Sequence, residues 1–185
     1  MKDKFIGLLR ETQRPGIENV IKYLEEKTDF FQAPASTQYH GAIEGGLLEH
    51  SLSVYDNLIK LSPLYVPDAK PESMVITALL HDICKANFYT VSQRNVKNEE
   101  TGKWEKQPFY KIEDQLPLGH GSKSVILLQQ MIRLSIDEVM AINWHMGLSD
   151  TDYAARQGMS KAFSEYPLAV ALHMADMASA YFDKK

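Results

Sequence analysis

Cysteine and long hydrophobic runs are nearly absent from this sequence. The 185 residues include one cysteine, Cys84, so no internal disulfide can form. This excludes the small secreted folds that depend on several disulfides. No stretch approaches the ~18 consecutive apolar residues of a membrane span, and the apolar part of the N-terminal segment is too short for a signal peptide. We therefore expect a cytoplasmic protein with no membrane association.

A strong charge of either sign is also missing. The net charge is −4, with 20 basic and 24 acidic residues, so we do not expect strong sequence-independent binding of nucleic acid. A local basic patch is still compatible with this balance. We find no repeat, low-complexity segment or linker. Because 185 residues can bury a sizeable core, we predict a single domain over residues 1–185.

Helical periodicity dominates what is present. Ile17, Val20, Ile21 and Leu24 recur at spacings of three and four, which is the apolar stripe of an amphipathic helix. Further helices are predicted over residues 45–61, 71–85, from about 119, from 136 and over 165–182. The last of these is apolar nearly all round, which indicates a buried central helix.

Proline and polar residues mark several helix ends. Pro63 is expected to end the helix that begins near residue 45, because proline removes a backbone donor and clashes with the preceding turn. Pro71 occupies a favoured position in the first turn of the next helix. Ser135 and Glu138 form a capping-box pattern, so a new helix should begin at Ile136.

Residues 88–112 break the helical pattern. Aromatic and β-branched residues dominate 88–91 and 104–112, and 98–103 has the composition of a turn, so we predict an inserted β-hairpin. Its aromatic residues are interleaved with a small excess of lysine and arginine. They could stack on nucleic-acid bases, cover an active site or form a dimer contact, and the sequence leaves these uses open.

The residues that suggest chemistry are histidines and aspartates. His81 and Asp82 end the apolar run 74–80, and Asp176 lies in an otherwise apolar helix. A buried carboxylate is costly unless it is paired or bound to a metal. His50, His120 and His145 lie in or beside other predicted helices. A lone histidine is most often an ordinary core or surface residue, so the inference of a shared cation depends on the whole set.

Imidazole and carboxylate ligands together favour a divalent transition metal. They suit Mn, Fe, Co, Ni or Zn, and Mg is also compatible with the carboxylates. Four residues are predicted to hold one ion: His50, His81, Asp82 and Asp176. Asp82 has two oxygens and could bridge to a second ion held by His120 and His145. We expect one or two ions.

This ordered set resembles the HD superfamily of metal-dependent phosphohydrolases. Residues 45–52 resemble the first-ligand motif of HD domains in 3′–5′ exoribonucleases and in relaxase-type conjugative proteins. Residues 81–85 resemble the common His-Asp-Ile-Gly-Lys form, with Cys84 in place of the usual small residue. The resemblance implies a mainly α fold, a bundle of about 7–8 helices, into which the hairpin near 88–112 is inserted.

The resemblance also implies roles for individual residues. It implies that water activated by metal attacks a phosphate ester, with Asp82 at the centre of the site. Lys85 would steady the substrate phosphate, and His120 would hold the second ion or contact phosphate. His40 stands near a histidine of the related nucleases, and would line the pocket or give a proton to the leaving oxygen. The expected substrate is a nucleotide or a short single-stranded nucleic acid.

Two other functions use the same residues. Some HD-type proteins bind two irons and oxidise their substrates with O₂, and a non-catalytic module could sense a nucleotide beside a structural metal. The nuclease relatives carry an additional nucleic-acid-binding domain, typically an OB fold, which is not evident in these 185 residues. The sequence therefore leaves the substrate open. It also leaves the oligomeric state open, a homodimer included.

Overall fold

The fold is a bundle of helices with a β-hairpin arm. The computed structural model describes residues 1–37, 41–99, 101–114, 116–148 and 153–183. The elements are α1 (Lys2–Glu11), α2 (Ile17–Glu26), α3 (Gly46–Tyr65), α4 (Pro71–Leu80), the short 3₁₀ helix η1 (Ile83–Lys85), β1 (Tyr89–Lys97), β2 (Trp104–Ile112), α5 (His120–Gln129), α6 (Ile136–Trp144), α7 (Tyr153–Glu165) and α8 (Pro167–Tyr181). These elements confirm the predicted mainly α fold class with one hairpin. Within the described ranges, every helix is too short or too polar to cross a membrane.

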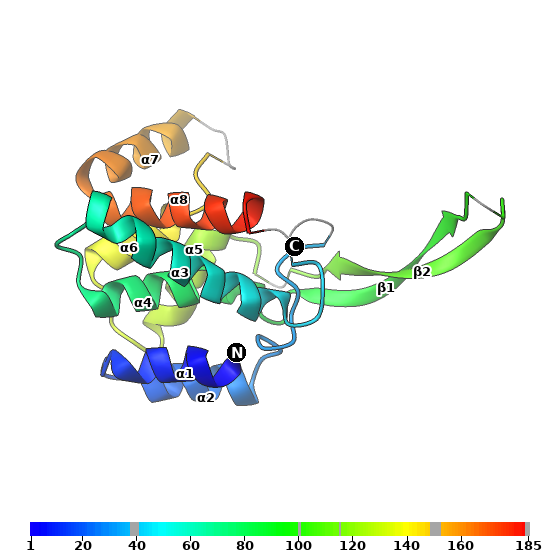
Figure 1. Ribbon diagram of the computed structural model, residues 1–185, viewed down its shortest axis with the longest axis horizontal. Coiled ribbons are helices and arrows are strands. Elements are labelled where there is room, and N and C mark those ends of the chain that lie inside the picture. The colour runs from blue at the N-terminus through cyan, green and yellow to red at the C-terminus, as the bar shows by residue number, and fades with distance from the viewer. Residues whose placement is uncertain (38–40, 100, 115, 149–152, 184–185) are drawn as a thin grey trace.

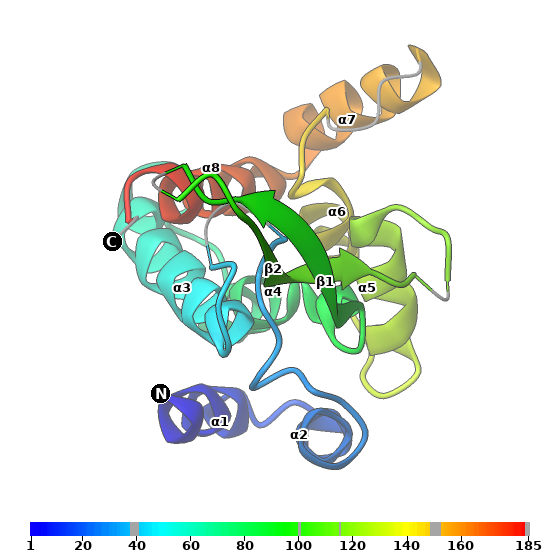
Figure 2. The ribbon, with the colours of Figure 1, turned by 90° about the vertical axis from the view of Figure 1, so that its right-hand side faces the viewer.

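The central helices are α3, α4, α6 and α8. Helix α3 packs against α8 and α4, and α6 packs against α8 and α5. Helices α1 and α2 lie on one side of this centre and α7 on the other (Figures 1 and 2). The apolar core has two parts: one includes Phe5 and Leu80, near α1 and α2, and the other includes Leu58 and Leu172, between α3 and α8.

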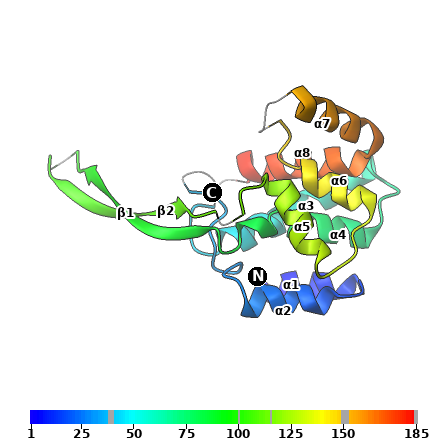
Figure 3. The same cartoon turned by 180° about the vertical axis from the view of Figure 1, so that it is seen from behind.

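The predicted hairpin forms an arm. Strands β1 and β2 pair antiparallel, from Tyr89 opposite Ile112 to Lys97 opposite Trp104. The arm projects away from the helices, as the views from the front and from behind both show (Figures 1 and 3). Most of its side chains are exposed. The arm therefore extends outward from the bundle and does not fold over it.

The prediction that Pro63 ends its helix was wrong. Helix α3 continues to Tyr65 with Pro63 inside it. Proline has no N–H to donate to the carbonyl of Ile59, four residues earlier. The hydroxyl of Ser62 donates to that carbonyl at 3.0 Å. This bond satisfies the acceptor that the proline would otherwise leave free.

The predicted helix 71–85 is broken at the His-Asp pair. Helix α4 ends at Leu80, His81 keeps helical angles, and Asp82 leaves them with φ −107° and ψ 22°. The chain then makes one 3₁₀ turn, η1. The break turns the side chains of His81 and Asp82 in directions that a continuous helix would not give them.

The remaining boundaries agree in part with prediction. The capping box at Ser135 and Glu138 is present, and α6 begins at Ile136 as predicted. Helix α8 is less buried than predicted, since Met177 and Tyr181 are largely exposed. Helix α7 was not predicted, because its sequence is mostly polar and small and gives only a weak apolar stripe.

Candidate metal centre

Several elements bring the predicted ligands to one place. His50 comes from the first half of α3, and Asp176 from α8. His81 and His145 each stand directly after a helix, α4 and α6, at the C-cap position. His120 is the first residue of α5. Residues far apart in the sequence are thus gathered where the ends of two helices meet the sides of two others.

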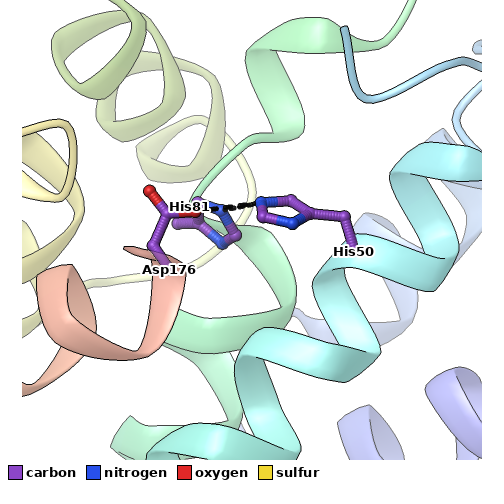
Figure 4. A group of neighbouring side chains, drawn as sticks. All are labelled: His50, His81 and Asp176. Atoms are coloured by element: carbon purple, nitrogen blue, oxygen red, sulfur yellow. Dashed lines mark hydrogen bonds and ion pairs between the residues drawn. The ribbon is translucent and has the colours of Figure 1, made fainter. Parts of the chain in front are cut away.

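One group of side chains consists of His50, His81 and Asp176. The Nε2 atoms of His50 and His81 lie 3.3 Å apart, and Nε2 of His50 lies 3.1 Å from an oxygen of Asp176. Figure 4 shows the three side chains pointing toward one another from α3, α4 and α8. Their potential ligand atoms all lie within 4.8 Å of one another, a spacing that could hold a metal ion.

Asp82 lies between this group and a second one. Its Oδ2 atom is 3.4 Å from Nε2 of His81 and 3.7 Å from Nε2 of His50. Its Oδ1 atom is 3.4 Å from Nε2 of His145. The two carboxylate oxygens therefore face different histidines, and His81, Asp82 and His145 form a second group that could hold a metal.

His120 lies at the edge of the cluster, beside Asp82. With Asp82 and Cys84 it forms a third group that could hold a metal. The sulfur of Cys84 is 3.3 Å from Nδ1 of His120. Burial raises the pKa of the Cys84 thiol to about 12, and the nearby Asp82 contributes to this rise. Cys84 is therefore a neutral thiol at ordinary pH, in line with the packed role that the sequence suggests.

The imidazole rings are held by hydrogen bonds at their outer nitrogens. Nδ1 of His81 donates to the carbonyl of Ala78 at 2.8 Å, and Nδ1 of His145 donates to the carbonyl of Ile142 at 2.7 Å. Nδ1 of His50 lies 3.0 Å from the hydroxyl of Ser179. Because a carbonyl only accepts, the neutral rings of His81 and His145 direct the lone pair of Nε2 inward. This is the orientation that second-sphere partners give to histidine ligands.

Ser179 was missed by sequence reasoning. It lies three residues after Asp176 on the same face of α8, and it is buried. A polar residue one turn from a buried carboxylate in an apolar helix is the signal that could have found it. The carbonyls of Ala78 and Ile142 carry no sequence signal, because every residue has one.

The donor set fits a divalent cation. The Nε2 lone pairs of His81 and His145 face the two oxygens of Asp82, so acceptors lie opposite acceptors there. Among the described residues, the buried side-chain atoms without a hydrogen-bond partner are Oδ1 of Asp82 and Nε2 of His145. Buried polar atoms of this kind normally have partners. A metal ion is the partner that suits oxygen and imidazole nitrogen together.

The carboxylates of the cluster are ionised. Burial alone would raise the pKa of Asp82, but the charge of Lys85 holds it well below its usual range. Burial also works against the charge of Asp176, and the hydrogen bond with His50 outweighs it and lowers the pKa. Negative charge is therefore present at the centre over the whole physiological range of pH.

Lys85 contacts Asp82 directly. Its Nζ lies 2.7 Å from Oδ2 of Asp82. A continuous helix would place Lys85 one turn after His81, but the break at Asp82 and the 3₁₀ turn bring it onto the carboxylate instead. Burial would lower the pKa of Lys85, and the contact with Asp82 outweighs this and raises it. Lys85 is a permanent cation at the edge of the cluster.

Two further polar residues, Lys123 and His173, make contacts that hold neighbouring parts of the chain together. Lys123 is buried, forms an ion pair with Asp114 and lies over the ring of Phe88 at 4.9 Å, so it ties the foot of the arm to α5. Nδ1 of His173 donates to the carbonyl of His145 at 2.6 Å, so its contact is with the backbone of a ligand candidate. His40 lies outside the described residues.

Gly121 has a use that the sequence did not indicate. A glycine directly after His120 would ordinarily suggest a turn of the chain at that point. Gly121 instead lies within α5, where an added Cβ would come within 2.2 Å of the carbonyl oxygen of Asn143. Glycine thus allows α5 and α6 to approach closely, and this places His120 near Asp82.

Comparison with known proteins agrees with this geometry. The family model of the HD domain matches residues 47–180. A protein of Methanocaldococcus jannaschii named dihydroneopterin 2′,3′-cyclic phosphate phosphodiesterase is 34% identical over 95 residues, which is 48% of this chain and 36% of that protein. The match thus covers little more than a third of the relative's length. No solved structure gives a significant match.

The matched region includes every described residue of the candidate centre, from His50 to Ser179. The order of the histidines and aspartates and the match to the HD family model agree. The chain belongs to the HD-domain superfamily of metal-dependent phosphohydrolases.

Proposed function

We propose that this chain hydrolyses a phosphodiester of a nucleotide or nucleotide-derived molecule at the cluster around Asp82. The observation that carries the proposal is the position of the Asp82 carboxylate. One of its oxygens lies nearest Nε2 of His50 and His81, and the other lies nearest Nε2 of His145. A carboxylate between two sets of ligands is the arrangement of two-metal phosphoesterases.

The proposed assignment of ligands is the one expected from the sequence, and the three groups of side chains around Asp82 support it. His50, His81, Asp82 and Asp176 hold one divalent ion, and His120 and His145 hold a second, with Asp82 between them. The ions supply a water nucleophile that is deprotonated near neutral pH and offset the negative charge of the phosphate oxygens. Mn, Fe, Ni, Co and Zn suit this mixture of imidazole and carboxylate, and Mg is also compatible.

The chain's own side chains orient the substrate and offset the negative charge of its phosphate. Lys85 remains charged and can hold a non-bridging phosphate oxygen while it stays near Asp82. In hydrolysis, the bond from the water oxygen to phosphorus forms and the bond from phosphorus to the leaving oxygen breaks. The leaving oxygen takes up a proton, and the products are a phosphate monoester and an alcohol. His120, half-buried at the edge, is placed to meet the substrate or to hold the second ion.

Cyclic phosphates are the first substrates to examine. The M. jannaschii relative is named for a 2′,3′-cyclic phosphate. Opening such a ring is hydrolysis of a phosphodiester and needs the same nucleophile. We therefore extend the proposal to 2′,3′-cyclic phosphate esters of nucleotide-derived compounds.

The test is hydrolysis by the metal-loaded protein. Purified protein would be stripped of metal, loaded in turn with Mn²⁺, Ni²⁺, Co²⁺, Fe²⁺, Zn²⁺ or Mg²⁺, and given 2′,3′-cyclic nucleotides, bis(p-nitrophenyl) phosphate and p-nitrophenyl phosphate. We expect the diesters to be hydrolysed by the wild type and by Asp56→Asn, a matched change at an exposed aspartate. We expect Asp82→Asn to be inactive.

Two outcomes would contradict the proposal. One is a metal-loaded wild type that hydrolyses no ester faster than Asp82→Asn. Tight binding of a nucleotide without turnover would then indicate a sensing module. The other is consumption of O₂ with a bound pair of irons, which would indicate oxygenase chemistry at the same ligands.

A further inference from the structure

The strand pairing divides the side chains of the arm between two faces. Alternate residues of a strand point to opposite sides, and directly paired residues share a side. We call one side the aromatic face; it consists of Tyr89, Val91, Gln93, Asn95, Lys97, Trp104, Lys106, Pro108, Tyr110 and Ile112. The second face consists of Thr90, Ser92, Arg94, Val96, Glu105, Gln107, Phe109 and Lys111.

The two faces differ in charge and in exposure. Among its ten residues, all within the described strands, the aromatic face has three aromatic rings, two lysines and no carboxylate. Trp104 is 70% exposed on this face. The second face has a carboxylate, Glu105, and its Arg94 lies over the ring of Phe109 at 5.7 Å. The aromatic face therefore presents aromatic rings and positive charge together.

The aromatic face begins at the candidate metal centre. Tyr89, its first residue, is half-buried, and its hydroxyl donates to the carbonyl of Ala35 at 3.3 Å. The ring of Tyr89 lies 5.0 Å from the ring of Phe88, which in turn contacts His120 at the edge of the cluster. The rings of Tyr89 and Tyr110 are 6.4 Å apart. The aromatic rings thus continue from the centre onto the arm.

The foot of the arm is fixed to the same cluster. Phe88, directly before β1, is buried, and its ring lies 5.4 Å from the ring of His120. Lys123 covers Phe88 from α5 and pairs with Asp114, just after β2. Each strand has nine residues, so the arm reaches about 30 Å from this foot at ~3.3 Å per residue.

An exposed two-stranded ribbon has little stability of its own. An isolated hairpin is marginal in water unless another element covers one face. Within the described residues, most of the arm's side chains are exposed on both faces. A surface that combines exposed aromatic rings with lysines matches single-stranded nucleic acid, in which bases stack and phosphates carry the charge.

We propose that the aromatic face of the arm binds a single-stranded oligonucleotide and leads one of its phosphodiesters to the centre around Asp82; this assignment rests on the proposed function of that centre. Bases stack on Trp104, Tyr110 and Tyr89 in succession. Lys97 and Lys106 contact phosphates near the tip of the arm. The candidate centre then receives the end of a strand whose other nucleotides lie along the arm.

A second copy of the chain is a poorer occupant of this face. A two-fold contact would set the aromatic face against itself. Lys97 and Lys106 of both copies would then share one interface, with no carboxylate among the ten residues of the face to offset them. Like charges brought together in this way oppose association.

The test compares two double variants that remove equal charge from opposite faces. Lys97→Gln/Lys106→Gln removes two cations from the aromatic face, and Arg94→Gln/Lys111→Gln removes two from the second face. Binding of a fluorescein-labelled single-stranded RNA 12-mer to the full chain would be measured by fluorescence anisotropy at several salt concentrations. Hydrolysis of bis(p-nitrophenyl) phosphate would report whether the centre is intact.

We expect only the first pair to weaken binding strongly. Its dissociation constant should rise about tenfold or more. The slope of log K against log salt should become shallower by roughly 1.4, which is about 0.7 for each phosphate that no longer has a lysine beside it. Trp104→Ala should also weaken binding by about tenfold, because one base can no longer stack. None of these variants should change hydrolysis of the small diester.

Three results would overturn the assignment. The first is an equal loss of affinity in both double variants, which would mean diffuse charge attraction. The second is no binding of the 12-mer by the wild type. The third is a concentration-dependent dimer that Trp104→Ala abolishes, which would make the face a contact between copies. Face-specific binding without hydrolysis of any diester would contradict the proposed function alone and would leave the binding assignment supported.

Discussion

The chain buries two clusters of polar and charged side chains, one around Glu138 and one around Asp82. In the first cluster every carboxylate oxygen of Glu138 has a donor. Arg14 donates to both oxygens, at 2.6 and 3.0 Å, and the hydroxyl of Ser73 donates at 2.7 Å. The backbone N–H of Ser135 donates at 2.8 Å and completes the capping box of α6. Donors and acceptors are matched within the chain.

In the second cluster, around Asp82, hydrogen-bond acceptors predominate. Asp82 and Asp176 are surrounded by the inward nitrogens of three histidines, whose outer nitrogens are already used. Oδ1 of Asp82 and Nε2 of His145 have no hydrogen-bond partner among the described residues. A buried polar cluster that serves stability satisfies its own atoms, whereas one that serves binding leaves atoms for a ligand. By this criterion the Asp82 cluster is the site.

Pocket volume alone would single out the Glu138 cluster. A pocket of about 980 Å³ is lined by Arg14, Glu138 and the first residues of α4, α6 and α8. Its buried charges are paired with each other, as in a structural ion pair. The chemistry of the donor atoms therefore distinguishes the two regions better than the volume beside them.

The largest effect is expected when the central carboxylate is removed. Asp82→Asn should lower kcat/KM for a diester roughly 1000-fold, because it removes the charged ligand shared by both groups, an electrostatic contribution of several kcal/mol. Glu138→Gln is the matched change in the other cluster. The protein that folds in this variant should keep a kcat/KM within about twofold of the wild-type value. Equal losses in the two variants would abolish the distinction between the clusters.

Stability should depend strongly on the ion pair of the Glu138 cluster. Arg14→Met leaves Glu138 buried without its main partner, and breaking a buried ion pair in this way costs about 3–5 kcal/mol. The free energy of unfolding, measured with urea, should fall by about that amount. Asp82→Asn also removes the partner of a buried charge, Lys85, so some loss of stability is expected there as well, and it is activity that separates the two clusters. A stable Arg14→Met protein would show that the Glu138 cluster is not structural.

Added metal should stabilise the protein through one cluster alone. A ligand that binds only the folded state at 100 times its dissociation constant adds about 2.7 kcal/mol. For a chain of 185 residues this raises Tm by roughly 5–10 °C. Mn²⁺ should give this rise in the wild type and in Glu138→Gln, and little or none in Asp82→Asn. A rise of equal size in all three would place the metal elsewhere.

The two clusters also differ in how far the sequence predicts them. His81, Asp82 and Asp176 stand out because each is a polar residue in an apolar helical stretch, where burial has a visible cost. Ser135 and Glu138 are recognised as a capping box, since that motif is local. Arg14 is not, because its contact with Glu138 joins residues 124 positions apart. Local patterns can be read from sequence, and long-range pairing cannot.

The geometry around the His-Asp pair could not be predicted from the sequence either. A continuous helix through Lys85 is what the apolar pattern predicts, since nothing in the composition marks the break at Asp82. The turn that follows the break, η1, packs against α5, which is far away in the sequence, and it carries Lys85 onto the carboxylate. The arm's existence was predicted from its β-branched and aromatic residues, whereas its direction depends on the packing of Phe88 at its foot.

A serine hydroxyl supports each cluster. Its removal should lower metal affinity in the Asp82 cluster and stability in the Glu138 cluster. Ser179→Ala removes the partner of Nδ1 of His50, and loss of such a partner lowers metal affinity by about tenfold or more. Ser73→Ala is the matched control, since both serines are buried and each contacts one member of a cluster. It should cost about 1–3 kcal/mol of stability and leave metal affinity unchanged. Titration calorimetry and urea unfolding would measure the two quantities, and a reversed outcome would exchange the roles of the clusters.

The smallest effect is expected in acid, from the titration of Glu138. Burial would raise its pKa, but the hydrogen bonds from Arg14, Ser135 and Ser73 outweigh this and lower it below the ordinary value of 4.5. A lowered pKa in the folded state adds stability that is present above pH 4.5 and is lost as the pH falls through the folded value. Below pH 4.5, the slope of unfolding free energy against pH should therefore be smaller in Glu138→Gln than in the wild type. The difference is at most about 1.4 kcal/mol per pH unit, since one proton is involved. Urea unfolding at a series of pH values in metal-free buffer would measure the slopes. Identical slopes would mean that the paired carboxylate contributes no more in the folded protein than in the unfolded chain.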